Sequence, residues 1–212
     1  MISSRHVVLV ALAVGLLVVP LSGQQRQKKL GPADFEPLLE QVKTAYNDKK
    51  FMLCIKYLQQ EVQICSEQLQ AAIRAARPNT PTGFKFVEKQ KQDMVNALGG
   101  NLGSAIGFVT ELEYRQESGS GSVRAKVMAD STTMATMLDA QFRMAALNPK
   151  LEVVTYNAHK ALFEKKANGD LKMQLLIDGK HYVEVTARGL SEDDFFKMFN
   201  QEFVDRLAKV LA

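Results

Sequence analysis

The sequence predicts an α+β fold: an N-terminal helical hairpin followed by a mostly antiparallel sheet with helices packed on one face. Three observations predict it. Before residue 77 the apolar residues recur at three- and four-residue spacing, and after residue 108 they alternate with polar residues. Short turns, several of them with glycine, separate the alternating segments, which favours hairpins and an antiparallel sheet. A linker with two prolines and a glycine, residues 77–83, divides the two parts.

Residues 1–23 have the pattern of a signal peptide. A short polar start with one firm positive charge precedes the apolar run Val7–Leu21. This run is shorter than the roughly 20 residues that a membrane-spanning helix needs, and Pro20 breaks its end. We therefore expect a periplasmic or secreted protein whose signal segment is cleaved or kept as an anchor, followed by a flexible tether over residues 24–31.

The composition limits the classes of partner. Hydrophobic residues make up 46% of the chain, enough to bury a core, and the net charge is only +4. Because this positive excess is small and spread along the sequence, it predicts neither nucleic acid nor a strongly acidic partner. Contact with a membrane is expected only through the signal segment, if that segment is uncleaved.

Residues 32–77 are predicted to form the helical hairpin, with helix-start chemistry at Pro32–Asp34. The first helix has apolar residues at helical spacing: Phe35, Leu38, Leu39, Val42, Ala45 and Tyr46. The second helix is longer and has the series Phe51, Cys54, Ile55, Leu58, Val62, Cys65, Leu69, Ala72 and Ile73.

The two cysteines, Cys54 and Cys65, both fall in the second predicted helix. Their separation in sequence places them roughly 16 Å apart along a helix axis, whereas a disulfide tolerates at most about 7 Å between Cα atoms. An internal disulfide is therefore excluded if the helix is continuous. We expect both to be small core residues, with an intermolecular bridge or a reactive thiol as the alternative.

Residues 78–107 are predicted to be linker and irregular segment, in which Phe84–Phe86 is compatible with a short strand. The α+β domain, residues 108–212, then begins with a hairpin of two strands. Placing Leu112 and Val127 on one face by pairing them directly leaves Gly119 and Ser120 as the loop.

A helix follows this hairpin, capped at Asp130–Thr132 and ending at Asn148–Pro149. Four further strands are predicted after it, over residues 151–156, 160–165, 171–177 and 182–187. Their connecting turns are Asn157–Ala158, Asn168–Gly169 and Asp178–Lys180. The polar start Ser191–Asp194 combines a cap with acidic first-turn residues and leads into a single amphipathic C-terminal helix.

The joint of the helical hairpin resembles one tetratricopeptide-type unit, in which a small residue and a tyrosine precede a tight turn and an aromatic residue. Here these are Ala45 and Tyr46, followed by Phe51 and Cys54. Lys49 occupies the turn position where glycine is common. Because a repeat array needs about three units to bury a continuous core, we expect a single hairpin packed on its neighbour.

Two further motifs extend the resemblance. The segment Pro78–Phe84 has the pattern Pro-x-x-Pro-x-Gly-aromatic, and Val127–Ser131 has the pattern Val-x-Ala-Asp-Ser. With the hairpin, they make the chain similar to small bacterial exported proteins of unassigned activity. The resemblance implies the same two-part fold and brings no catalytic residues with it.

The sequence shows no arrangement of residues typical of catalysis or metal binding. Outside the signal segment the histidines are His159 and His181, and neither has metal-site spacing. Asp178 and Glu184 are the acidic residues near His181 in sequence. Asp178 is better explained as a turn residue than as a site residue, and Glu184 falls on the opposite strand face from His181. No Gly-x-Ser-x-Gly motif is present, and Gly99–Gly103 lacks the Lys-Ser/Thr pair of a phosphate-binding loop. We predict no catalytic, cofactor-binding or metal-binding residues.

An apolar pocket between the helix of residues 131–147 and the sheet is the alternative to a filled core. Methionine side chains adapt easily to a ligand. The candidate lining residues are Met134, Met137, Leu138, Met173 and Leu175.

A complete architecture without a recognisable site favours a non-catalytic exported protein of the periplasm or envelope that acts by protein binding. Its candidate contact surfaces are the helical hairpin and the open face of the sheet, and its expected partner is another envelope protein. A carrier of an apolar small ligand is the alternative, and an unrecognised hydrolase comes third. The sequence leaves the oligomeric state and the biological process open.

Overall fold

A computed structural model describes residues 30–88 and 108–212. The predicted signal peptide, most of the tether and the Gly99–Gly103 segment lie outside these residues. Residues Gly31–Ala212 belong to one structural unit, and the predicted α+β class with its N-terminal helical hairpin is confirmed. No helix within the two described ranges combines the length and hydropathy needed to cross a membrane.

The hairpin consists of the short 3₁₀ helix η1 (Pro32–Asp34), α1 (Phe35–Asn47) and α2 (Phe51–Ala75). A Schellman-type turn ends α1. In it the Lys50 N–H donates to the Ala45 carbonyl at 2.8 Å, and the Lys49 N–H donates to the Tyr46 carbonyl at 3.0 Å. Lys49 supplies the left-handed conformation that the turn requires, with a φ of 59°. The turn therefore forms without the glycine that is common there.

Helix α2 is continuous, and both of its cysteines are free thiols. Cys54 is buried, as expected of a core residue. Cys65 is exposed, so the expectation of a second buried cysteine is wrong.

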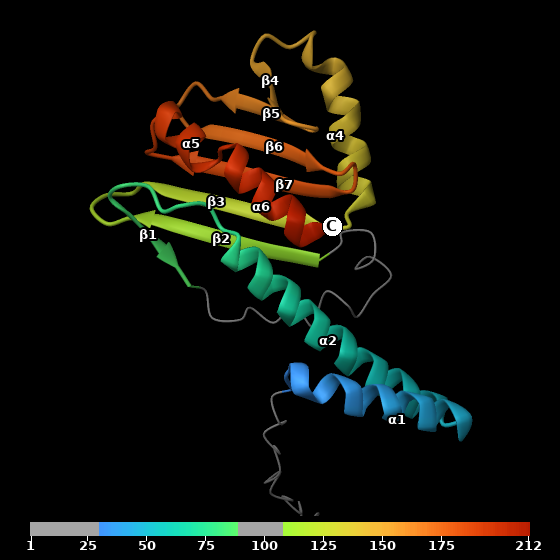
Figure 1. Ribbon diagram of the computed structural model, residues 1–212. Coiled ribbons are helices and arrows are strands. Elements are labelled where there is room, and N and C mark those ends of the chain that lie inside the picture. The colour runs from blue at the N-terminus through green and yellow to red at the C-terminus, as the bar shows by residue number, and fades with distance from the viewer. Residues whose placement is uncertain (1–29, 89–107) are drawn as a thin grey trace, which may run out of the picture. The chain divides into compact units, whose positions relative to one another are not determined.

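The sheet has seven strands in the order β1-β2-β3-β7-β6-β5-β4, and all neighbouring strands are antiparallel (Figure 1). The strands are β1 (Phe84–Val87), β2 (Phe108–Gln116), β3 (Ser122–Ala129), β4 (Leu151–Tyr156), β5 (His159–Lys165), β6 (Leu171–Ile177) and β7 (His181–Arg188). The helices of this part are α4 (Thr132–Ala145), α5 (Glu192–Met198) and α6 (Gln201–Leu211). Strand β1 lies in the stretch predicted to be linker, and it forms one edge of the sheet.

The predicted turns between the later strands are confirmed, whereas the first hairpin has a different register. Leu112 pairs with Ala125, two residues away from the predicted partner Val127. The cause is a contact at the turn: the Gln116 N–H donates to the Gly121 carbonyl at 2.9 Å, and the Gly121 N–H donates to the Gln116 side-chain oxygen at 3.1 Å. The loop therefore spans residues 117–120. A shift of two residues keeps every side chain on its predicted face.

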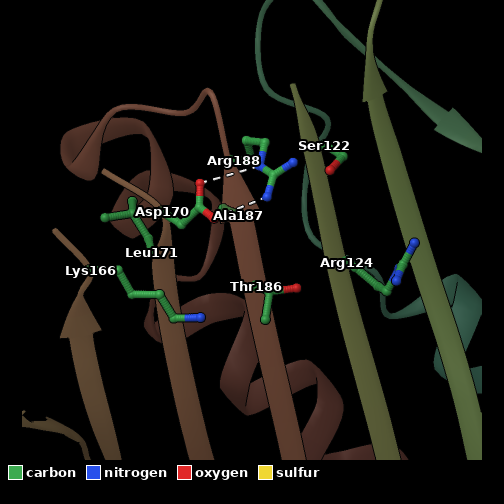
Figure 2. A pocket seen from close by; sticks show the side chains of 8 residues that line it. All are labelled: Ser122, Arg124, Lys166, Asp170, Leu171, Thr186, Ala187 and Arg188. Atoms are coloured by element: carbon green, nitrogen blue, oxygen red, sulfur yellow. Dashed lines mark hydrogen bonds and ion pairs between the residues drawn. The ribbon is translucent and has the colours of Figure 1, made fainter. Parts of the chain in front are cut away.

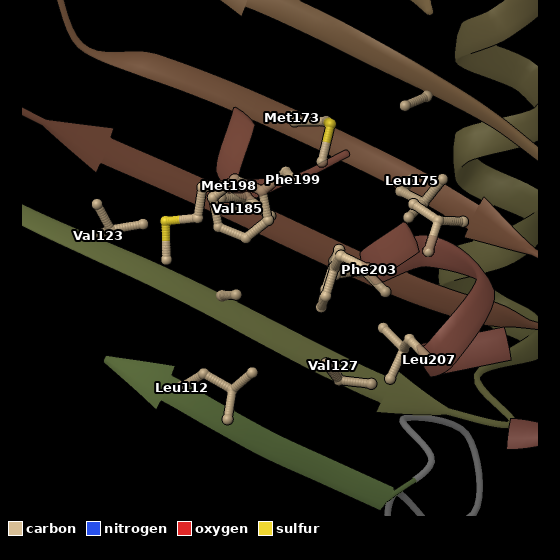
Figure 3. Packing of buried hydrophobic residues seen from close by; sticks show 14 of the residues in the cluster. Leu112, Val123, Val127, Met173, Leu175, Val185, Met198, Phe199, Phe203 and Leu207 are labelled. Atoms are coloured by element: carbon tan, nitrogen blue, oxygen red, sulfur yellow. The ribbon is translucent and has the colours of Figure 1, made fainter. Parts of the chain in front are cut away.

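The main core lies between the sheet and helices α5 and α6 (Figure 3). Inward-facing strand residues meet the aromatic and aliphatic side chains of these helices. Examples are Val127, Met173, Leu175 and Val185 from the strands and Met198, Phe199, Phe203 and Leu207 from the helical segment.

The expectation that the helices pack on one face of the sheet is corrected by α4. Leu138 of α4 belongs to a second buried cluster with Met128, Leu162 and Tyr182. These strand residues point to the opposite face from their neighbours in the main core, because side chains alternate along a strand. Helix α4 therefore covers part of the face that α5 and α6 leave open.

The predicted single C-terminal helix is two helices. Phe199 leaves the helical conformation, and Asn200 caps α6 by accepting a hydrogen bond from the Phe203 N–H at 3.0 Å. Phe199 and Phe203 are both fully buried. The break thus lets successive aromatic side chains reach the sheet. The predicted cap at Ser191 is confirmed, since its hydroxyl accepts from the Asp194 N–H at 3.1 Å.

Contacts near the end of α2 join the hairpin to the sheet. Ile73 is fully buried in the main core, and Leu69 packs partly against it. The buried Tyr114 hydroxyl on β2 donates to the Pro78 carbonyl at 3.0 Å. The Arg77 guanidinium lies 4.8 Å from the centre of the Phe86 ring. The C-terminal end of α2 therefore packs into the core of its own chain.

Candidate protein-binding surface

Exposed apolar side chains gather on the helical hairpin. Eleven large hydrophobic residues are exposed in the described ranges, and seven belong to the hairpin. These seven are Tyr46, Phe51, Met52, Leu53, Ile55, Leu58 and Val62. Soluble proteins seldom gather apolar side chains on one surface unless that surface binds something. The hairpin is therefore the first candidate site.

Helix α2 has two apolar faces. One contains the buried residues Cys54 and Ile64 and packs in the hairpin with α1. The other, which we call the α2 seam, lies about 100° further round the helix axis. The α2 seam consists of Phe51, Ile55, Leu58, Val62 and Cys65. Its four large side chains are 55%, 48%, 43% and 39% exposed in that order.

An aromatic pair ends the seam at the tip of the hairpin. The rings of Tyr46 and Phe51 meet edge to face, with their centres 6.1 Å apart and their planes at 71°. This geometry is a favourable one for aromatic pairs. The two rings are held in place while still mostly exposed, so the tip offers a preformed apolar contact.

The open face of the sheet, the second predicted contact surface, has a different character. Arg124 pairs with Glu111 at 2.8 Å, and Lys172 pairs with Glu184 at 3.2 Å. Burial raises the pKa of Tyr182 to about 12, so its hydroxyl stays protonated and donates to Glu184 at 3.2 Å. These polar groups already have partners within the chain, and the surface gains little from a further one.

A polar hollow of about 270 Å³ lies beside β3, β6 and β7. Figure 2 shows the side chains that line it, among them Arg124, Lys166, Asp170 and Arg188. Arg188 holds Asp170 through two contacts, at 3.3 and 3.4 Å, and this hydrogen bonding lowers the pKa of the Asp170 carboxyl. Two of the three cations that line the hollow are therefore already paired, Arg188 with Asp170 and Arg124 with Glu111.

The structure does not bring the five predicted pocket residues together. Met173 and Leu175 are fully buried in the main core, which faces α5 and α6. Leu138 and Met134 belong to the cluster on the opposite face, so the sheet separates the two pairs. Met137 is 54% exposed. These positions support the filled-core interpretation for Met173, Leu175 and Leu138.

Among the described residues, Ser131 and His181 are the pair that most resembles a hydrolase site, and both are buried. His181 is buried, and its Nδ1 accepts a hydrogen bond from the Asp130 N–H at 2.9 Å. The Ser131 hydroxyl is buried without a hydrogen bond, and the His181 ring interacts with the Leu211 backbone, not with Ser131. A nucleophilic serine needs a base within hydrogen-bonding reach and access to substrate. These residues have neither.

Metal binding has no support in the described ranges. No group of three or more His, Cys, Asp and Glu side chains there is arranged to hold a metal ion. His159 lies 3.8 Å from the Asp178 carboxylate, and Asp178 holds the turn between β6 and β7 with a φ of 50°.

Comparison with known protein families, curated proteins and solved structures found no match to this chain. The resemblance to small exported proteins stays a prediction. The α2 seam was missed at the sequence level because its residues were included in one apolar series with Cys54. The signal that separates them is the alternating spacing of four and three residues from Phe51 to Cys65.

Proposed function

We propose that the protein is an exported, non-catalytic protein of the periplasm or envelope that binds another protein chain through its helical hairpin. The observation that carries this proposal is the exposed α2 seam. A helix whose apolar residues all faced its own hairpin partner would leave a polar outer surface. Helix α2 instead presents a second apolar stripe to solvent.

The burial of this stripe supplies a driving force for binding. Fully burying a side chain such as Ile55 or Leu58 contributes about 1.5–3 kcal/mol relative to leaving it exposed. Each is somewhat less than half exposed, so roughly half of that amount remains to be gained. Burial of four such side chains and the Tyr46 ring would offset part of the translational and rotational freedom that binding costs.

A photoreactive phenylalanine analogue at Leu58 tests the proposal in the full chain, in cells that make it. Leu58 is in the middle of the α2 seam. Gln63, an exposed residue of the same helix outside the seam, is the matched control position. We expect a covalent protein adduct from position 58 and none from position 63. Irradiation that leaves the chain unmodified at position 58 would count against protein binding by the hairpin.

A further inference from the structure

The spacing along the α2 seam is that of a coiled coil. From Phe51 to Cys65 the intervals are four, three, four and three residues, an average period of 3.5. This is the repeat that keeps one stripe facing a partner helix along its length. Leu69 continues the spacing but packs partly against the main core. The seam therefore runs for roughly 21 Å and stops where α2 enters the core of its own chain.

Three of the five residues on the seam, Ile55, Leu58 and Val62, are of the types found in parallel two-stranded coiled coils. In heptad notation Ile55 and Val62 occupy position a, and Phe51, Leu58 and Cys65 occupy position d. Branched Ile or Val at a together with Leu at d favours parallel dimers. The helix is already formed and held against α1, so pairing adds no cost of helix nucleation.

The flanks of the seam allow two identical helices to meet. Charged residues between Phe51 and Leu69 are Lys56, Glu61 and Glu67. The positions that directly follow the d residues are Met52, Gln59 and Ser66, all uncharged. Self-pairing thus brings no like charges together along this flank. A lipid surface is a poorer fit, because helices that lie on membranes usually have Lys and Arg beside their apolar face.

We propose that the partner of the α2 seam is a second copy of this chain, and that the two α2 helices pair in parallel as a short two-stranded coiled coil. This inference rests on the proposed function and names its partner. In a parallel pair each d residue faces its own counterpart across the two-fold axis. Cys65 then faces Cys65 of the second copy, whereas Cys54 stays buried within each hairpin.

The mass of the full chain at sedimentation equilibrium, under reducing conditions, tests the dimer. We expect twice the monomer mass for the unmodified chain and for the control Gln63→Lys. Leu58→Glu and Leu58→Lys are each expected to be monomers, because like charges would meet at a d position. Mixing these two variants is expected to restore the dimer, which misfolded chains could not do.

Oxidation by diamide tests the orientation. Two Cys65 thiols would lose two hydrogens to diamide, giving one disulfide and the corresponding hydrazine. We expect a covalent dimer that Cys65→Ser abolishes and Cys54→Ser does not. In an antiparallel pair centred on Leu58, the two thiols would lie about 20 Å apart and could not bridge.

The outcomes separate this inference from the proposed function. An unmodified chain that stays monomeric at all concentrations overturns the self-pairing. If position 58 then cross-links to a different protein, the proposed function stands with another partner. A monomer that binds vesicles of anionic phospholipid through the seam, with no protein adduct, overturns both. A dimer that diamide does not cross-link overturns the parallel arrangement.

Discussion

Cys54 and Ile55 are consecutive residues of α2, yet Cys54 is 7% exposed and Ile55 is 48% exposed. Consecutive helix residues point about 100° apart, so these two mark the separate apolar faces of α2. The first face holds the hairpin together. The second is largely exposed, although its Phe51 ring contacts Tyr46, and its spacing fits a second copy of the same helix.

A buried carboxylate in the hairpin is expected to weaken it. Glu61 of α2 is 7% exposed, and its Oε1 atom is buried without a hydrogen bond. Glu61→Met removes this unsatisfied group and keeps a similar volume, so we predict a gain of about 1 kcal/mol in the free energy of unfolding. Urea denaturation measures the change. Glu67→Met, at a less buried position of the same helix, should change stability by no more than about 0.5 kcal/mol.

The hydrogen bond from Tyr114 to Pro78 joins β2 to the segment after α2. Tyr114→Phe leaves the Pro78 carbonyl, in a buried residue, without this donor. We predict a loss of about 1–3 kcal/mol in the free energy of unfolding. Tyr46→Phe is the matched control, because the Tyr46 ring is exposed. Equal stability of the two variants in urea denaturation would show that the Tyr114 hydroxyl is not important for the fold.

The first hairpin depends on the absence of a side chain at Gly121. A Cβ atom there would lie 2.6 Å from the Gln116 side-chain oxygen and 3.2 Å from the Arg188 carbonyl. Gly121→Ala is therefore predicted to lower the thermal midpoint, at a cost of about 1–3 kcal/mol. Gly31→Ala has open space around it and a φ of −139°, and should leave the midpoint unchanged. A tolerated Gly121→Ala would argue against the register described for β2 and β3.

Stability is predicted to fall in mild acid through His181. Burial of the ring, with a smaller effect of the Lys180 charge, lowers the pKa of His181 below its ordinary value of 6.5. The unfolded chain then takes up a proton at a higher pH than the folded chain does. The contribution of the neutral His181 ring to the free energy of unfolding is therefore complete above about pH 6.5. It is lost as the pH falls towards the lower pKa of the folded chain.

The variant His181→Asn tests this dependence. Its side-chain oxygen can accept the Asp130 N–H as Nδ1 does, and it does not titrate near neutral pH. The loss of unfolding free energy between about pH 7.5 and about pH 5 should be smaller in His181→Asn than in the unmodified chain. Identical losses in the two proteins would rule out His181 as the source of the acid sensitivity.

The alternation of apolar and polar residues predicted much of the fold, because the length of each turn determines which residues of the two adjoining strands share a face. The turn Asp178–Lys180 placed the core residues of β6 and β7 on one face, and the structure has that arrangement. Parity cannot detect a shift of two residues, so the register at Leu112 was predicted wrongly. The contact between Gln116 and Gly121 that fixes it involves side-chain geometry that alternation does not encode.

The placement of the helices was harder to predict. Met128, Leu162 and Tyr182 are apolar residues on the strand face that α4 covers, but they come from three strands whose order in the sheet was not known from sequence. The candidate pocket failed for the same reason, since Met134 and Met173 lie on opposite sides of the sheet. Likewise, the spacing of the α2 seam can be read in the sequence, but the sequence does not show which face of α2 is covered by α1.

The reactivity of Cys65 towards a maleimide, measured by mass spectrometry over a range of concentrations of the full chain, tests the central claim most directly. Cys65 is exposed in a single copy and lies on the α2 seam. We predict that its labelling slows as the chain concentration rises, and that Leu58→Lys removes this protection. A labelling rate that is the same at every concentration would contradict the pairing of two chains through α2.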